Sequence, residues 1–332
     1  MTRTIRFKLT PGLPNLVPLG LCLVGLWAIA PARSESSPPG AWVVKAPMPA
    51  IRNEVAATAL DGKVYVLGGN IGGGAADLAR NEEYDPATDQ WKIRWPLPRG
   101  ANHMNAVTLN GKIYAIGGFA DARHVNPVDG VFEYDPAANS WRTLAPLSGP
   151  RGSVAVAAVD GKIHAIGGRG PDFKPVATHQ VLDPATGQWS EAAPLPGRAR
   201  DHTATIAVDG KIHVIGGRFG EPTETTDMHL VYDPAANSWS AAAPLPAPRS
   251  SLAVAFYKGL ILVVGGETDT KSLADNDGYD VKVDRWIKLA PLPSPRHGIA
   301  AATVGNFAYF AGGAQGVGGN LTSDQLFAFS MP

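Results

Sequence analysis

The chain has 332 residues, of which 45% are hydrophobic, and its 29 basic and 29 acidic side chains leave a formal net charge of zero. This hydrophobic content can build a large buried core, and 38 glycines with 29 prolines are too few for a disordered low-complexity protein. The lack of a basic surplus argues against an electrostatic nucleic-acid binder, which needs a positive patch along the phosphate backbone.

The first 32 residues have the pattern of a secretory signal peptide. A basic start precedes an apolar stretch whose uninterrupted part, Leu19–Ala30, would span only about 18 Å as a helix, too short for a ~30 Å bilayer core. Small residues predict cleavage after Ala32, and residues 33–40 are expected to form a flexible leader. We therefore expect a periplasmic or secreted protein, with no stable membrane span after cleavage. A retained N-terminal anchor is the alternative.

Cys22 is the only cysteine and lies inside the predicted signal peptide. The processed chain would therefore have no disulfide, no thiolate metal site and no cysteine nucleophile. Because no other metal-ligand spacing in the chain is specific, we predict neither a metal nor a cofactor.

From residue 41 onward the chain repeats a pattern of about 50 residues. Each full repeat has a tight-turn signal, an apolar β-run, a pair of glycines, a loop, and a further strand that ends in an aromatic residue or leucine, followed seven residues later by tryptophan. The glycine pairs, spaced by 49, 50, 49, 49 and 47 residues, are Gly68-Gly69, Gly117-Gly118, Gly167-Gly168, Gly216-Gly217, Gly265-Gly266 and Gly312-Gly313. Short strands separated by turns predict an all-β chain.

The repeat resembles the kelch-repeat family of bacterial exported type, in which each repeat folds into one four-stranded blade of a β-propeller. The resemblance covers Trp42 to Phe329 and implies a single six-bladed domain over residues 41–332. The last repeat lacks a tryptophan strand, and Trp42 supplies that motif from the N-terminal side. We therefore expect the N- and C-terminal strands to pair in one blade, which leaves no open sheet edge. We expect a monomer.

An arginine register lies sixteen residues before the glycine pairs. Its members are Arg52, Arg151, Arg200, Arg249 and Arg296, with Ala101 in the second repeat. A propeller places this position at the start of the innermost strand, at one mouth of the central channel. Two interpretations stay open: the guanidinium groups hydrogen-bond loop carbonyls, or they form a ring that binds carboxylate or phosphate.

Other polar residues are expected at the same mouth, just after the arginine register or just past the glycine pairs. The candidate ligand-binding residues among them are Glu54, His103, Arg169, His202, Arg218 and His297. With Asp201 and Glu267 they offer acid–base chemistry or a loose metal site. Because the second, fourth and sixth repeats are expected to lie far apart around the ring, no specific catalytic site is predicted.

Five further histidines are expected to have no functional role. His164 and His213 occupy a register shared with tyrosine and leucine, so we expect them to pack between blades. His124, His179 and His229 lie in or beside the long loops and are expected to be solvated.

These features favour a non-catalytic binding module that recognises an acidic protein segment or a small anionic ligand at the loop-bearing mouth. The alternative is a periplasmic carbohydrate enzyme, which a similarity to sialic-acid mutarotase implies, with Glu54, His103, His202 and Arg200 as the acid, base and guanidinium groups. The copper and tyrosine–cysteine chemistry of galactose oxidase, another kelch-fold enzyme, is excluded for a processed chain without cysteine. Whether the chain is an enzyme stays open at this point.

Overall fold

The structure is a computed structural model, described here for residues 37–332 except 73–77 and 122–123. The predicted signal peptide lies outside the described residues. Twenty-six strands form six four-stranded antiparallel sheets and one small hairpin, with two short 3-10 turns. In this part of the chain no helix is long and apolar enough to cross a membrane.

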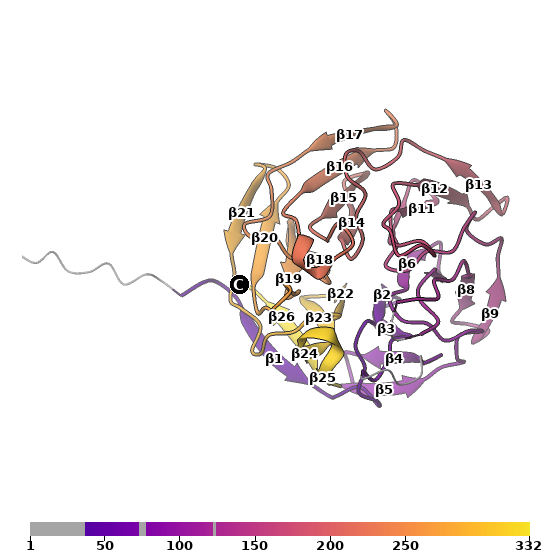
Figure 1. The fold of residues 1–332 in the computed structure, drawn as a ribbon. Helices are drawn as coiled ribbons and strands as arrows, with labels where there is room; N and C mark the ends of the chain where they lie inside the picture. Colours follow the sequence, from indigo (N-terminus) through magenta and orange to yellow (C-terminus); the bar gives the residue numbers. More distant parts are fainter. Residues whose placement is uncertain (1–36, 73–77, 122–123) are drawn as a thin grey trace, which may run out of the picture. The chain divides into compact units, whose positions relative to one another are not determined.

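The six sheets are the blades of a propeller, with the first strand of each blade nearest the common centre (Figure 1). Blades 1 and 2 contain β2 (Ala56–Leu60), β3 (Lys63–Leu67), β4 (Asn81–Asp85), β5 (Gln90–Ile93), and β6 (Asn105–Leu109), β7 (Lys112–Ile116), β8 (Val131–Asp135), β9 (Ser140–Thr143). Blades 3 and 4 contain β10 (Ala155–Val159), β11 (Lys162–Ile166), β12 (His179–Asp183), β13 (Gln188–Glu191), and β14 (Ala204–Val208), β15 (Lys211–Ile215), β16 (His229–Asp233), β17 (Ser238–Ala241). Blades 5 and 6 contain β18 (Ala253–Tyr257), β19 (Leu260–Val264), β20 (Asn276–Asp280), β21 (Arg285–Lys288), and β22 (Ala300–Val304), β23 (Phe307–Ala311), β26 (Leu326–Ser330), β1 (Ala41–Lys45). The loops hold η1 (Pro222–Glu224), β24 (Ala314–Gly316), η2 (Val317–Gly319) and β25 (Asn320–Thr322).

Blade 6 closes the ring with strands from both ends of the described chain. Strand β1 pairs with β26 in antiparallel register, and Trp42 lies opposite Phe329 (Figure 1). The Trp42 ring packs at centroid distances of 4.9 Å from Phe329 and 5.2 Å from Phe310, so burial of aromatic surface holds the closure. The predicted pairing of the N- and C-terminal strands is confirmed.

The hydrophobic core is divided into six clusters, each shared by two neighbouring blades. Tryptophan side chains of the outer strands add one hydrogen bond at each interface, because the indole Nε1–H donates to a carbonyl in the linker that leaves the preceding blade, at 2.8–2.9 Å. The pairs are Trp42–Ala290, Trp91–Ala46, Trp141–Trp95, Trp189–Ala145, Trp239–Ala193 and Trp286–Ala243. The repeated tryptophan therefore connects each blade to the preceding one by a hydrogen bond.

The glycine pairs are required where one blade approaches the next. At Gly117 the backbone has φ +65°, and a Cβ would lie 2.5 Å from the carbonyl oxygen of Arg151. Glycine is the residue that adopts this left-handed conformation without a side chain in the way. The pair thus lets the start of the following blade pack against the strand end.

Two pairs of buried histidines lie between blades. His164 Nδ1 is 2.9 Å from His179 Nε2, and His213 Nδ1 is 2.9 Å from His229 Nε2. The expected packing role of His164 and His213 is confirmed, but the expectation that His179 and His229 are solvated is wrong, since each is only 2% exposed. Burial lowers the pKa of all four imidazoles to about 4.

Candidate functional site

Six residues, one from each blade, form what we call the axial ring, just before the innermost strands. Its members are Glu54, His103, Ser153, His202, Ser251 and Gly298. All six have left-handed backbone, with φ between 50° and 60°. Five of the six amides donate a hydrogen bond to the carbonyl of the ring member in the preceding blade, at 2.7–3.2 Å. At the remaining step the side chains meet, with Ser153 Oγ 3.2 Å from His202 Nε2.

The residue before each ring member anchors the ring to the loop side of its own blade. Each forms an isolated antiparallel bridge to the residue that follows the glycine pair. The bridges are Asn53–Asn70, Asn102–Phe119, Gly152–Arg169, Asp201–Arg218, Ser250–Glu267 and His297–Ala314. Residues from the two predicted registers therefore share the loop-bearing mouth, as the spacing indicated.

The arginine register lies inside the blades. Arg52, Arg151, Arg200, Arg249 and Arg296 are at most 4% exposed. In four of the five blades that have this arginine, the guanidinium donates to the carbonyl of the first glycine of its own blade, at 2.9–3.0 Å. Arg200 donates instead to Val214 O at 3.2 Å. This arrangement agrees with the interpretation that they hydrogen-bond carbonyls, and it does not place a ring of guanidinium groups on the channel surface.

Glu54 is the carboxylate of the axial ring. Its Oε2 lies 3.0 Å from His103 Nε2, and its Oε1 lies 3.7 Å from His297 Nε2, which is also 3.4 Å from Glu267 Oε2. Burial alone would raise the pKa of Glu54, but the nearby His103, His297 and His202 outweigh it and hold that pKa well below its usual range. The carboxylate is therefore ionised at neutral pH.

His202 is oriented by a buried carboxylate. Its Nδ1 lies 2.6 Å from Asp201 Oδ1, and Asp201 also accepts from Arg169 Nε at 2.7 Å and from Arg218 Nε at 3.4 Å. Arg218 Nη2 lies 2.9 Å from His202 Nε2. Burial lowers the pKa of His202 well below its ordinary value, and Arg218 and His103 lower it further, so the imidazole is neutral.

His124, on the loop between β7 and β8, joins this group. Its ring centroid is 4.2 Å from that of His103, 5.1 Å from that of Phe119 and 5.6 Å from that of His202. Nitrogen atoms of the three imidazoles lie within 4.8 Å of one another. Burial, reinforced by His103 and His202, lowers the pKa of His124 far below its usual value. The expectation of a solvated loop residue is wrong here, because the side chain is half-buried against the ring.

The expectation that the second, fourth and sixth repeats keep their polar residues far apart is also wrong. The rings of His103 and His202 are 4.9 Å apart, and Glu54 lies between His103 and His297. The reason is geometric: the start of each innermost strand lies at the propeller axis, where all six blades converge. Blades on opposite sides therefore contribute side chains to one cluster.

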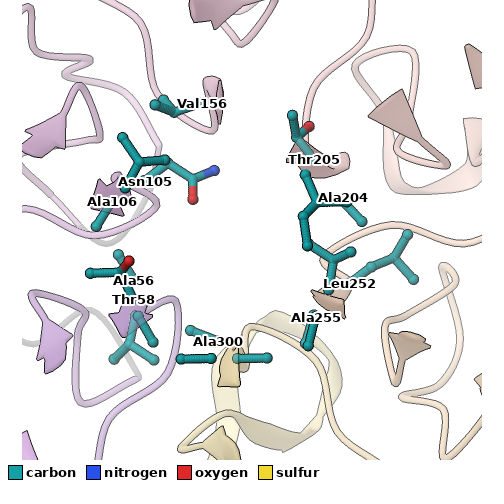
Figure 2. Close-up of a pocket in the computed structure, with 18 of the residues that line it drawn as sticks. Ala56, Thr58, Asn105, Ala106, Val156, Ala204, Thr205, Leu252, Ala255 and Ala300 are labelled. Carbon is teal, nitrogen blue, oxygen red and sulfur yellow. The ribbon is translucent and has the colours of Figure 1, made fainter. Parts of the chain in front are cut away.

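The axial ring borders a cavity of about 410 Å³ that continues along the innermost strands β2, β6, β10, β14, β18 and β22. Its walls are mostly small or hydroxylated, and Figure 2 shows Ala56, Thr58, Ala204 and Thr205 around the open centre. The Asn105 amide points into this space and donates to Val154 O at 3.0 Å (Figure 2). Where other blades have alanine, blade 2 thus offers a polar group.

Comparison with known families agrees with the repeat and the blades. The KLHDC2/KLHL20/DRC7 Kelch-repeats domain matches residues 152–332, more than half of the chain, and the Kelch motif matches residues 51–93 and 101–148. The chain belongs to the kelch-repeat family. A search of curated proteins finds no match.

Among solved structures, this kelch propeller is similar to one described as "Structure of YjhT". The two share 18% sequence identity with a TM-score of 0.72, over 84% of this chain and 95% of the other. At this identity the similarity shows the fold alone. The kelch pattern accounts for the blades. The axial ring is where this chain departs from repetition, since its six members comprise four residue types: glutamate, histidine, serine and glycine.

Sequence reasoning missed His124 as a member of the site. Its loop position gave no periodic signal, since the loops are the variable part of each kelch repeat. The neighbouring Phe119 was a usable indication, because a large apolar residue just past a glycine pair makes a surface against which a loop folds back. It is fully buried and packs against His103 and His124.

Proposed function

We propose that this kelch propeller binds a small hydroxylated ligand, such as a monosaccharide, in the channel next to the axial ring. The observation that carries this proposal is the meeting of Glu54, His103 and His202, from three different blades, at the wall of a cavity of about 410 Å³. That volume lies in the range of small-molecule pockets, ~300–1,000 Å³. The kelch fold by itself is compatible with a binding module or a propeller enzyme.

The lining matches a ligand rich in hydroxyl groups. An ionised carboxylate such as Glu54 accepts hydrogen bonds from hydroxyls, and the Ser153, Ser251 and Thr203 side chains can donate or accept. Alanine at most inner-strand starts leaves the room that a ligand needs. Charge-assisted hydrogen bonds to Glu54 would supply the orientation.

An acidic protein segment has weaker support as the ligand of this site. That expectation rested on the guanidinium groups of the arginine register, which are buried in the blades. Arg169 and Arg218 lie nearer to the channel, but both are paired with Asp201, and Arg218 is also 3.5 Å from Glu267. Anionic sugars remain one arm of the test because Arg218 could exchange one of these carboxylate partners for the carboxylate of the ligand.

The test is titration calorimetry of the purified propeller with a panel of neutral and anionic monosaccharides. Glu54→Gln keeps the side-chain shape and should weaken binding about 10- to 100-fold, the effect of losing a hydrogen bond to a charged group. The double variant His164→Leu/His179→Asn alters buried histidines away from the channel and should bind like the wild type. Failure of every sugar to bind the wild type would reject the proposal.

A second candidate is an acid–base carbohydrate enzyme similar in reaction to sialic-acid mutarotase. It is favoured by the Asp201-oriented imidazole of His202 and by the Glu54 carboxylate, which belong to the same axial ring and border the same cavity. Ring opening and closure of a sugar needs one group to donate and one to accept a proton. Each positioned group of this kind raises the reaction rate by about 10²–10⁴-fold. Mutarotation of anionic sugars followed by polarimetry tests it, and a rate equal to buffer would remove it.

We further infer that the chain is exported and acts as a monomer. The apolar segment with small residues before Ala32 supports export. N-terminal sequencing of protein from the exported fraction should begin at Arg33, and a start at Met1 would contradict cleavage. Light scattering of the purified propeller tests the monomer.

A further inference from the structure

Three imidazoles converge on one side of the axial ring without a hydrogen bond between them. His103 and His202 come from the ring itself, and His124 comes from the blade 2 loop. His103 and His202 are 7% and 5% exposed, so two of the three rings are out of bulk water. By contrast, the His164–His179 and His213–His229 pairs each use a direct nitrogen–nitrogen hydrogen bond.

Neighbouring acceptors determine which nitrogens of His103 and His202 face the cluster. Asp201 can only accept, so His202 carries its proton on Nδ1, and its Nε2 keeps the lone pair. The Nδ1 of His103 faces the amide oxygen of Asn102, whose Nδ2 donates to Asp121 O at 2.9 Å, so this nitrogen also carries a proton. A histidine that binds a metal usually donates its other nitrogen in this way to a carboxylate or carbonyl, which fixes the tautomer and the ring direction.

Glu54 supplies a carboxylate beside one of these imidazoles. Its Oε2 lies 3.0 Å from His103 Nε2. Two ligand atoms bound to one tetrahedral zinc ion at ~2.0–2.1 Å are separated by roughly 3.3 Å. A nitrogen lone pair and a carboxylate oxygen repel at this separation unless a cation lies between them, and either a proton or a metal ion fulfils this condition.

We propose that His103, His124 and His202 bind one divalent transition-metal ion, zinc above all, and that Glu54, beside His103, turns toward the ion as the fourth ligand. Imidazole with carboxylate is a ligand set that zinc accepts, and the set contains neither the thiolates that favour softer ions nor the all-oxygen environment that calcium and magnesium need. The inference goes beyond the proposed ligand binding, because the metal would be held by the protein alone.

Arg218 is the group that a metal ion has to displace. Its Nη2 lies 2.9 Å from His202 Nε2 and, closer than Ser153 Oγ at 3.2 Å, occupies the lone pair that would bind the ion. Arg218 Nη1 is already 3.5 Å from Glu267 Oε1, so a small rotation toward that carboxylate keeps the guanidinium paired. Zinc and Arg218 are thus expected to compete, and Arg218→Gln should bind zinc more tightly than the wild type.

The experiment is metal titration of the purified propeller, without a polyhistidine tag and after treatment with a chelator. Cobalt(II) is added first, and the visible d–d absorption of the bound ion reports tetrahedral coordination; zinc should then displace it at one ion per chain. His124→Ala removes a ligand on a loop outside the strands and should weaken zinc binding by more than the ~10- to 100-fold that loss of an outer-shell partner costs. The control His164→Leu/His179→Asn removes two histidines elsewhere and should bind zinc like the wild type.

Uptake of one ion by the wild type and the control, lost in His124→Ala, supports the site. Wild-type protein that takes up no cobalt or zinc, or His124→Ala that binds as tightly as the wild type, overturns it. The absorption readout needs no sugar, and the sugar titration is run with chelator present. Failure of the metal site and failure of the proposed ligand binding are therefore told apart.

Discussion

Replacing His164 with leucine and His179 with asparagine should make the propeller more resistant to acid. The chain itself contains this pair at the same register of blade 5, where Leu262 and Asn276 stand in place of the two histidines. Asn276 Nδ2 donates to a linker carbonyl at 3.0 Å, and His179 Nδ1 interacts with the equivalent carbonyl at 3.0 Å. The double variant thus keeps the hydrogen bond and removes two groups that titrate.

The magnitude follows from the pKa difference between the folded and unfolded chains. Burial lowers the pKa of His164 and His179 to about 4 in the fold, whereas an unfolded histidine has its ordinary pKa of about 6.5. Between these values the unfolded chain binds more protons, so stability is present above pH 6.5 and is lost as the pH falls toward 4. From pH 8 to pH 5 each histidine costs about 2 kcal/mol of unfolding free energy, and the pair about 4 kcal/mol.

Urea unfolding followed by tryptophan fluorescence, at several pH values between 8 and 5, measures this difference. At pH 8 the difference in unfolding free energy between variant and wild type reports any change in packing. The test is how this offset changes with pH. The offset should move by about 4 kcal/mol in favour of the variant at pH 5. Parallel pH profiles for the two proteins would refute the reasoning and show that the histidines are already protonated in the fold or neutral in the unfolded chain.

Two further predictions concern the frame of the blades, both read out as the free energy of unfolding. Arg249→Met should cost about 3 kcal/mol, because the 1%-exposed Asp277 loses its buried guanidinium partner at 2.7 Å and keeps only the half-exposed Lys288, at 3.1 Å. Arg200→Met should stay within about 1 kcal/mol of the wild type, since among the described residues no carboxylate pairs with Arg200. Equal losses for the two arginine variants would contradict the pairing argument. Gly117→Ala should be about 2 kcal/mol more destabilising than Gly111→Ala. Both glycines have φ near +70°, but only at the first does a Cβ meet an atom of the next blade, so similar losses would mean that the blades can move apart.

The amino-acid sequence by itself was enough to predict the number of blades, their order and the closure of the ring. Each blade is encoded by a local pattern of turn, strand, glycine pair and tryptophan at nearly constant spacing, and the pattern is readable without knowing what lies next to it. The closure was predictable for the same reason. Trp42 carries the motif that the last repeat lacks, and the pairing with Phe329 follows.

The chemistry of the channel mouth was predictable only in part. The register spacing brought Glu54, His103 and His202 to one mouth, because residues at equal positions in the repeat occupy equal positions in the ring. The direction of each side chain did not follow from spacing. Arg52 turns into its blade, whereas Glu54, two positions later, faces the axis. That choice depends on the left-handed backbone at Glu54, which is set by hydrogen bonds to neighbouring blades.

Only the tertiary structure decided which residues meet at the axis. His103, His124 and His202 are separated by up to 99 positions in the sequence, and their rings nevertheless lie within 6 Å of one another. Such contacts arise because six blades converge on a narrow channel and because a variable loop folds back onto a buried phenylalanine. The folding back of the loop is not periodic, so the repeat that reveals the fold places His103 and His202 at the axis but carries no signal for His124.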